Sequence, residues 1–148
     1  MSRMAAQRSI DSQLFEWPAG EPRLIGGECR SCGVVNFPRQ GSCPRCCGSD
    51  ITTRRLGNVG RLWTWTTQEF APKSPPYAVT RGPEGFAPFL VGYIELPGEV
   101  IVESRIVAAH SQELAIDMPM QLTFAPLFTD AEGAEVIGFA FAPAPRAA

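Results

Sequence analysis

The stretch CRSCGVVNFPRQGSCPRC, residues 29–46, decides the fold. It holds two Cys-x2-Cys pairs, Cys29 with Cys32 and Cys43 with Cys46, which are ten residues apart. A glycine follows the first pair and a proline lies inside the second, and both permit the tight turn that aims two thiolates at one ion. Four sulfurs in a tetrahedron at about 2.3 Å are typical of structural zinc. The spacing therefore predicts one zinc ion held by these four cysteines.

Iron is the alternative metal, because a rubredoxin-like iron site uses the same turns. The sequence offers no redox partner group, so zinc is favoured. A closed site of four sulfurs has no open position for water, so its expected work is to fold about thirty residues that lack a core of their own. Cys47 is left over, because the two-residue spacing favours Cys46 as the ligand.

The composition of the 148 residues limits the function classes. The chain is 45% hydrophobic and 19% charged, and its fourteen glycines and fourteen prolines favour short strands and turns. A net charge of -2 argues against a nucleic-acid binder, which needs a basic face. With neither an apolar signal region nor an apolar run of about 18 residues, we expect a cytoplasmic protein without a membrane contact.

The flanking segments predict a short helix before the cysteines and strands after them. Asp11 or Ser12 is placed to cap a helix that would carry Leu14 and Trp17 on one side. Beyond residue 57 the pattern is typical of strands, because β-branched and aromatic residues occur in alternating runs. The five predicted strands cover residues 60–70, 89–96, 100–107, 118–125 and 137–141.

Five short antiparallel strands favour a small barrel of the OB type, which hides the strand edges. The expected fold is thus mainly β, with three parts. These are an N-terminal helical segment at 1–21, a zinc ribbon at 22–52 and an OB-fold domain at 53–148.

The connection at residues 71–87 is long and has no clear periodicity. Such segments are uncommon in compact domains and are often functional. This one contains Lys73, Tyr77, Arg81 and Phe86 among its prolines. It is either a loop that contacts a ligand or partner, or a plain surface insert.

No group of residues predicts catalysis by the chain alone. His110 is the single histidine, and a lone loop histidine is usually a surface group. Glu95 and Glu103 are placed to face each other across a hairpin, where carboxylates are usually solvated. Neither a glycine-rich phosphate loop nor a Gly-x-Ser-x-Gly motif occurs, so a nucleophile, a base and an oxyanion site are not found together.

Seven motifs in chain order carry a family resemblance. They are GECRSCG at 27–33, FPR at 37–39, CPRC at 43–46, GRLWTWT at 60–66, the pair at 76–77, LAIDMPM at 114–120 and FAFAP at 139–143. In this combination the chain resembles the acyl-CoA-associated OB-fold proteins that have an N-terminal rubredoxin-like zinc ribbon. The likeness covers about residues 11–143.

The resemblance implies a function as well as a fold. Members of this family assemble with thiolase-like enzymes, or with hydratases, and the partner carries the catalytic residue. The chain would be a non-catalytic accessory subunit of a thiolase-like or aldolase-like enzyme, with acyl-CoA as the shared substrate and a hydratase as the runner-up partner. The supported reaction would be carbon–carbon bond cleavage in the degradation of aromatic or steroid side chains.

Eight side chains are candidates for contact with partner or substrate. The six aromatic ones are predicted to meet the acyl group or the partner, although the tryptophans are also candidates for the barrel core. The two cations are predicted to meet CoA phosphates, with plain surface charge as the alternative. The candidates are Trp63, Trp65, Phe70, Lys73, Tyr77, Arg81, Phe86 and Phe89.

Two departures and two alternatives accompany this interpretation. Many members have glycine where this chain has Asp117, a residue type that tolerates the left-handed turn. Residues 78–88 separate the Pro76-Tyr77 pair from the next strand. The first alternative function is a single-stranded nucleic-acid-binding OB-fold protein, since OB barrels stack bases on strand aromatics. The second is a thioesterase that works without a partner.

Overall fold

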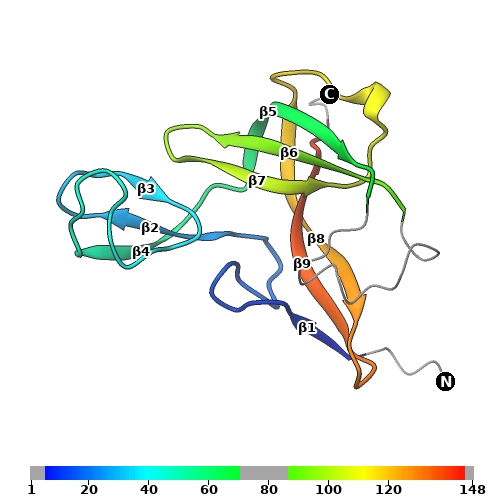
Figure 1. The fold of residues 1–148 in the computed structure, drawn as a ribbon, viewed down its shortest axis with the longest axis horizontal. Coiled ribbons are helices and arrows are strands. Elements are labelled where there is room, and N and C mark those ends of the chain that lie inside the picture. Colours follow the sequence, from blue (N-terminus) through cyan, green and yellow to red (C-terminus); the bar gives the residue numbers. More distant parts are fainter. Residues whose placement is uncertain (1–5, 71–86, 146–148) are drawn as a thin grey trace.

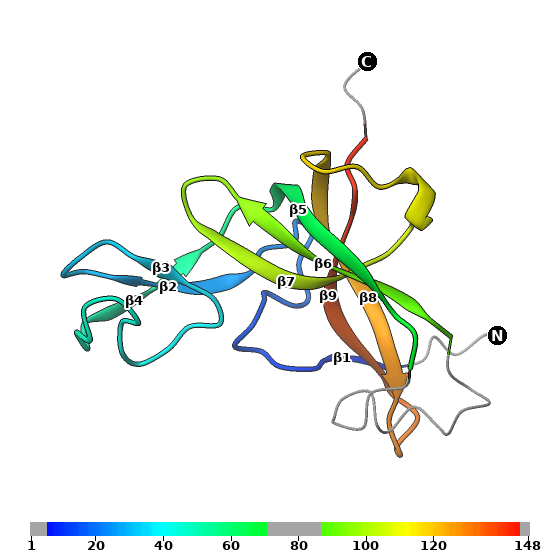
Figure 2. The ribbon, with the colours of Figure 1, turned by 45° about the horizontal axis from the view of Figure 1, so that its top comes forward.

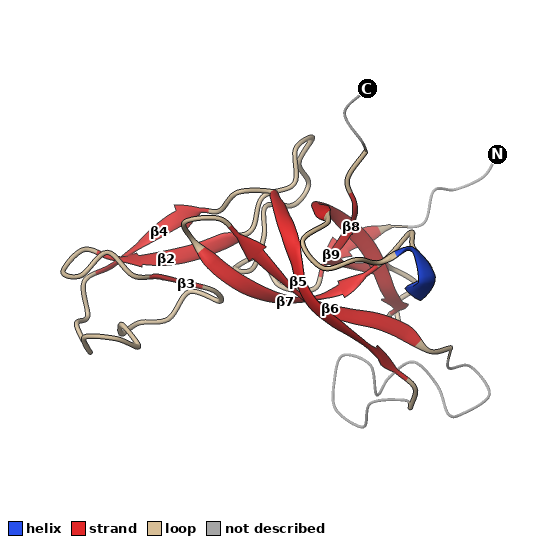
Figure 3. Ribbon diagram, turned by 90° about the horizontal axis from the view of Figure 1, so that it is seen from above, coloured by secondary structure: helices blue, strands red, loops and turns tan. Residues whose placement is uncertain are grey.

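The computed structural model describes residues 6–70 and 87–145, which form two β-sheets lying side by side (Figure 1). A three-stranded sheet lies to one side of a closed barrel, and the same separation is visible after a 45° turn (Figure 2). Within the described ranges the helical structure is one 3-10 turn, Ser111–Glu113, and Figure 3 shows strands and loops elsewhere. The prediction of a mainly β fold is confirmed.

The small sheet contains the first cysteine turn. Strand β2 (Ile25–Cys29) lies between β3 (Val35–Asn36) and β4 (Ile51–Arg55), and both neighbours run antiparallel to it. Strand β3 follows the first pair of cysteines. The small sheet therefore joins chain segments on both sides of the cysteine stretch.

The barrel consists of five strands: β5 (Val59–Gln68), β6 (Phe89–Leu96), β7 (Val100–Ile106), β8 (Pro119–Thr129) and β9 (Glu135–Pro143). They hydrogen-bond in the order β9-β7-β6-β5-β8, and an antiparallel pairing of β8 with β9 closes the ring. The β7–β9 pairing is parallel. This is the five-stranded OB topology that the strand count predicted.

Alternate residues of each barrel strand fill the interior. On β6 the even-numbered residues are buried, whereas the odd-numbered ones are at least partly exposed. The largest buried side chains include Leu62, Ile94, Leu122 and Phe141, each at most 1% exposed. Each such burial contributes about 1.5–3 kcal/mol, so apolar packing is the main source of the barrel's stability.

Two turns agree with the sequence. The hairpin between β6 and β7 turns at Gly98, which has a φ of 73°. Asp117 has a φ of 69°, and its backbone N–H donates to the carbonyl of Leu62 at 2.8 Å. The left-handed conformation that the family often supplies with glycine is therefore present here on an aspartate, a residue type that enters this region more readily than most.

The predicted N-terminal helix is wrong. Strand β1 (Gln7–Ser9) pairs in parallel with β9, and a turn follows it. Asp11 does accept a hydrogen bond from the backbone N–H of Gln13 at 2.8 Å, but this bond closes a turn rather than capping a helix.

The physical reason is that the backbone bonds here with another segment of the chain. The N–H of Glu16 donates to the carbonyl of Arg23 at 3.0 Å, and the N–H of Ile25 donates to that of Leu14 at 2.8 Å. These bonds between distant residues of the same chain replace the i to i−4 hydrogen bonds of a helix. An isolated helix of this length would be only marginally stable. Phe15 is buried at 1% exposure. The predicted helix face, in contrast, was built on Leu14 and Trp17.

The small sheet is attached to the barrel by polar and apolar contacts. The carboxylate of Glu99, in the β6–β7 turn, accepts from Arg54 at 3.0 Å and from the backbone N–H of Gly57 at 2.7 Å. The Phe37 and Phe139 rings meet edge to face with centroids 5.5 Å apart. The two sheets are therefore in direct contact.

Candidate functional site

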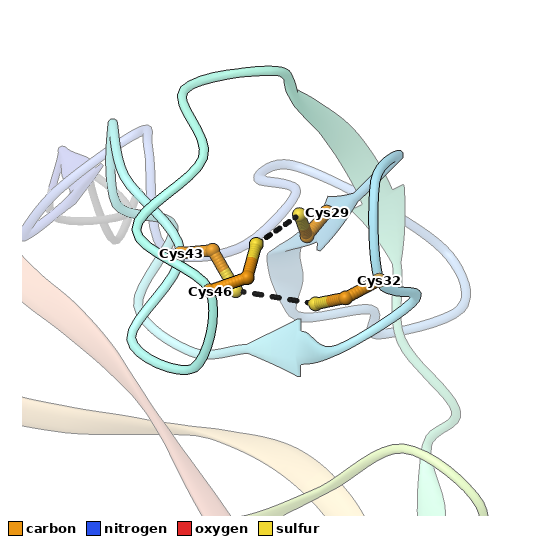
Figure 4. A group of neighbouring side chains, drawn as sticks. All are labelled: Cys29, Cys32, Cys43 and Cys46. Carbon is orange, nitrogen blue, oxygen red and sulfur yellow. Dashed lines mark hydrogen bonds between the residues drawn. The ribbon is translucent and has the colours of Figure 1, made fainter.

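The four predicted ligands lie at one end of the small sheet, in two turns of the same design. In each turn the backbone N–H four residues after the first cysteine donates to that cysteine's carbonyl, from Gly33 to Cys29 at 2.8 Å and from Cys47 to Cys43 at 3.0 Å. Gly33 has a φ of 81°, which explains a glycine at this position. Both turns therefore present their thiols toward a common centre, as Figure 4 shows.

The distances between the sulfurs suit a tetrahedral ion. All four Sγ atoms lie within 4.8 Å of one another. Cys29 Sγ is 3.6 Å from Cys46 Sγ, and Cys32 Sγ is 3.5 Å from Cys43 Sγ. Four sulfurs at about 2.3 Å from a zinc ion would be about 3.8 Å apart, so little movement is needed. The donor set therefore fits one structural zinc ion.

The thiols differ in pKa because backbone hydrogen bonds and neighbouring sulfurs act on them to different extents. The pKa of Cys43 is lowered to about 6, chiefly by a hydrogen bond from the backbone N–H of Cys46. For Cys46 the backbone N–H of Gly48 lowers the pKa, but the neighbouring thiols of Cys29 and Cys32 outweigh it and raise the value to about 12. Four adjacent thiolates would repel one another, so full ionisation needs a cation at the centre.

Cys47 lies outside this group of four. It is exposed, its φ is 63°, and its sulfur is not among the four that lie within 4.8 Å of one another. All five cysteines are free of disulfide bonds. The group of four close sulfurs contains Cys46 and not Cys47, and the ligand assignment itself stays a prediction.

The aromatic candidates on the barrel do not form one group. Trp63 is 53% exposed and meets Tyr93 edge to face at 6.2 Å, whereas Trp65 is half-buried against the barrel core. Phe70 is 80% exposed beyond the end of β5. Phe89 is half-buried beneath a guanidinium. The remaining candidates, Lys73, Tyr77, Arg81 and Phe86, lie outside the described residues.

Sequence reasoning missed two residues of the outer barrel face. Tyr93 was read only as part of a strand, and Arg105 was not singled out. Arg105 lies over the Phe89 ring, 4.7 Å from its centroid. Both have odd numbers on strands whose even-numbered residues are buried, so the alternation was the signal that could have found them.

Known catalytic arrangements are absent from the described part of the chain. His110 is exposed at the start of the 3-10 turn, and its side chain forms no capping bond. Glu103 pairs with Tyr93, and Glu95 pairs with Ile101, so the expectation that the two carboxylates face each other directly is wrong. The described residues thus supply no base that is positioned beside a nucleophile.

A groove of about 800 Å³ lies between the outer face of the β6–β7 hairpin and the N-terminal segment. Its walls are mainly apolar and include Leu14, Phe37, Val91 and Phe139. Phe37 directly follows β3 of the small sheet, so the segment beside that sheet also contributes to the groove. This strand face is the one that OB folds commonly use to bind ligands.

Two family models match consecutive parts of this chain. Residues 17–53 match the rubredoxin-like zinc ribbon domain of ChsH2, and residues 53–125 match its C-terminal OB-fold domain. The chain belongs to the ChsH2 family. The family resemblance drawn from the motifs is therefore confirmed. The prediction of a zinc ribbon followed by an OB-fold domain is confirmed as well.

Curated relatives span most of the chain. A DUF35 domain-containing scaffold protein of Methanocaldococcus jannaschii is 28% identical over 122 residues, which cover 81% of each protein. The benzoylsuccinyl-CoA thiolase subunit BbsA of Thauera aromatica is 26% identical over 131 residues, covering 86% of this chain and 83% of BbsA. This family member is therefore similar along its length to a scaffold protein and to a thiolase subunit.

A solved structure shares the fold. A chain of the Ltp2-ChsH2(DUF35) aldolase superposes with a TM-score of 0.59 at 23% identity, covering 82% of this chain and 84% of that one.

Within residues 6–70 and 87–145, none of the helical structure has the length and hydropathy of a membrane span.

Proposed function

We propose that this chain is a non-catalytic accessory subunit of a thiolase-like or aldolase-like enzyme that acts on acyl-CoA thioesters. The observation that carries the proposal has two parts. The described residues form a cysteine cluster and a closed barrel, and they do not place a base beside a nucleophile. The 26% identity with a thiolase subunit over 131 residues supports it. The partner would supply the reacting groups for carbon–carbon bond cleavage in the degradation of aromatic or steroid side chains, and this chain would help to shape the acyl-CoA pocket.

We further propose that Cys29, Cys32, Cys43 and Cys46 bind one zinc ion whose role is structural. The sulfur distances support this ligand set, as does the ribbon-type family match at residues 17–53. Zinc would supply the positive charge that lets four adjacent thiols ionise together. It would hold the ribbon, which we place at residues 22–52, against an OB-fold domain at 53–148.

The metal proposal is tested by counting zinc per purified chain. One zinc per chain is expected for the native sequence and for Cys47→Ser, and less than one for Cys43→Ser. Iron in place of zinc would show that the site is a rubredoxin-type iron site. A metal-free protein with its thiols joined in disulfides would contradict the ligand assignment.

The outer face of β5 and β6 is the proposed contact with the partner. Val59 and Trp63 are each 53% exposed, and Tyr93 is 43% exposed beside Trp63. Large aromatic residues with this exposure are enriched at the centre of protein interfaces. Phe70 lies beyond the end of β5 and Trp65 is half-buried against the barrel core, and we keep both as contact candidates.

The accessory role is tested by co-expression with a thiolase-like protein from the same genome. The two proteins should co-purify, and acyl-CoA turnover should need the partner. Trp63→Ala should weaken the complex, whereas Ile116→Ala, a change at a side chain that is 58% exposed elsewhere on the barrel, should not. Acyl-CoA cleavage by the isolated chain would contradict the proposal. Salt-dependent retention on single-stranded DNA would favour the nucleic-acid alternative, which rests on the exposed aromatic pair of the OB face.

A further inference from the structure

The groove between the β6–β7 hairpin and the N-terminal segment has, among its described lining residues, one cation in a mainly apolar wall. Arg105 is the cation, and its neighbours across the strands are Val91 on β6 and then Thr66 on β5. All three face outward, so they form a row across the floor of the groove. The Phe89 ring lies under the guanidinium at 4.7 Å and helps to hold it in place.

The guanidinium of Arg105 has hydrogen-bonding capacity that its described neighbours do not use. Its Nε is buried and has no hydrogen-bond partner within the described ranges. It forms no ion pair with a carboxylate of those residues, although Arg8, Arg23, Arg54 and Arg55 each do. A buried N–H group without a partner is destabilising, and arginine is well suited to bind a carboxylate in two-point fashion.

We propose that this groove binds a small carboxylate that has an apolar body. The carboxylate would pair with Arg105, and the apolar body would lie against Leu14, Ile101 and Phe139. The volume of about 800 Å³ is in the range of small-molecule sites. With a single cation in its described lining, the groove suits one anionic group rather than a run of phosphates.

Glu103 gives the proposal a second and opposite test. It lies two residues before Arg105 on the same outward face of β7 and also lines the groove. The ion pairs of the described residues do not include one between these two side chains. The carboxylate of Glu103 would therefore repel an anionic ligand, and its removal should strengthen binding.

The test uses the isolated full-length chain and three ten-carbon probes that differ in head group: decanoate, decanol and decyltrimethylammonium. Binding is followed by chemical-shift changes of the backbone amides of β6 and β7. Decanoate should bind best. Arg105→Met should weaken decanoate binding about ten- to a hundredfold and leave decanol nearly unchanged. Glu103→Gln should strengthen decanoate binding.

The matched control is Arg61→Met, which removes the same charge from an exposed position on β5 outside the groove lining. It should leave decanoate binding unchanged. Equal binding of decanoate and decyltrimethylammonium by the native chain, or weaker binding of decanoate by Glu103→Gln, would overturn the proposal. Since no partner is present in this assay, its result is independent of whether the chain assembles with a thiolase-like enzyme.

Discussion

The small sheet and the barrel are built from the same kind of strand but are stabilised differently. The barrel belongs to a cluster of twelve buried residues, among them Leu62, Ile94 and Phe141, so apolar burial can support it. The separate cluster of the small sheet contains only Cys29, Cys43 and Ile51, two of which are cysteines of the proposed metal site. The barrel can therefore rely on its own apolar core, whereas the small sheet needs a cross-link between its cysteines.

The contact between the sheets makes this comparison testable. Leu24 and Leu56 flank the small sheet in the chain, but both are fully buried in the cluster of the barrel. The backbone N–H of Leu56 donates to the carbonyl of Leu24 at 2.9 Å. The base of the small sheet is thus anchored in the barrel core, and its far end depends on the cysteines.

The largest expected effect is loss of order at that far end when the metal site is broken. In Cys43→Ser, or after treatment with a strong chelator, the amides of β2 to β4 should exchange rapidly, while those of β5 to β9 stay protected. Structural zinc contributes about 10–16 kcal/mol in isolated zinc fingers, which exceeds what three buried residues can replace. Hydrogen exchange read by mass spectrometry separates the two sheets.

The control for this prediction is Cys47→Ser, which makes the same chemical change beside the site. It should leave protection in both sheets as in the native chain. If the exchange of β2 to β4 is unaltered after metal removal, the small sheet has enough apolar support of its own and the contrast between the sheets is lost. If both sheets unfold together, the anchoring through Leu24 and Leu56 is stronger than the barrel core.

The next largest effect is expected from truncating a side chain in the barrel core. This change should destabilise the barrel and leave the metal site intact. Phe141→Ala removes a fully buried ring at the β7–β9 pairing, where Phe141 pairs with Ile106. The free energy of unfolding should fall by about 3–5 kcal/mol, as for other buried aromatic deletions. Denaturant titration measures this loss, with Ile116→Ala as the exposed control.

Zinc content distinguishes the two regions in this second variant. At temperatures where the Phe141→Ala barrel remains folded, the metal bound per chain should stay as in the native protein. Loss of zinc without global unfolding would show that the four-cysteine turns depend on barrel packing. The independence of the metal site would then be contradicted.

Sequence reasoning predicted those features that depend on local spacing. The cysteine pairs define the metal turns, because each turn is completed within five residues, as the bond from Gly33 to Cys29 shows. The barrel strands follow from alternation, because one face of each strand is buried. The N-terminal helix was predicted wrongly, since the hydrogen-bond partners of Glu16 and Leu14 lie seven and eleven residues away, beyond the reach of a helical pattern.

The groove could not be predicted for a similar reason. Its walls come from all five barrel strands, the segment after β3 and the N-terminal segment, and only the folded registers bring Phe37 and Phe139 into contact. The outward direction of Arg105 could be deduced from alternation, but the lack of an ion-pair partner among the described residues could not. Site residues that depend on tertiary contact therefore need the structure.

The close approach of strands at the base of the small sheet gives a smaller and sharper prediction. A Cβ at Gly26 would lie 2.6 Å from the backbone carbonyl oxygen of Asn36 and 3.0 Å from a methyl group of Leu56. Gly26→Ala should therefore cost about 1–3 kcal/mol, as in other overpacked sites. Gly41→Ala, where no atom lies within 4 Å, is the matched control and should be close to neutral. Thermal unfolding of the two variants measures the difference, and equal stabilities would mean that β2 and β3 can separate without cost.

The smallest effect concerns β1, the strand at the outer edge of the barrel. Arg8 donates to the carboxylate of Asp130 at 2.9 Å, and the backbone N–H groups of Ala134 and Glu132 donate to the same carboxylate. The Arg8 hydrogen bond first, and then that of Ala134, lower the pKa of Asp130 below its ordinary value.

A carboxyl group whose pKa is lowered by folding stabilises the fold above its unfolded pKa, which is about 4 for aspartate. That contribution is lost as the pH falls through the lower folded value. At neutral pH the amides of Gln7–Ser9 should therefore exchange faster in Asp130→Asn than in the native chain, and the difference should shrink as the pH falls below the ordinary aspartate pKa of about 4. Added salt should reduce only part of the difference, because Arg8 is half exposed and screened, whereas the two backbone hydrogen bonds are not removed by salt. A difference between the two proteins that persists unchanged into strong acid would mean that Asp130 positions the β8–β9 turn by shape alone, and that β1 is held by its pairing with β9.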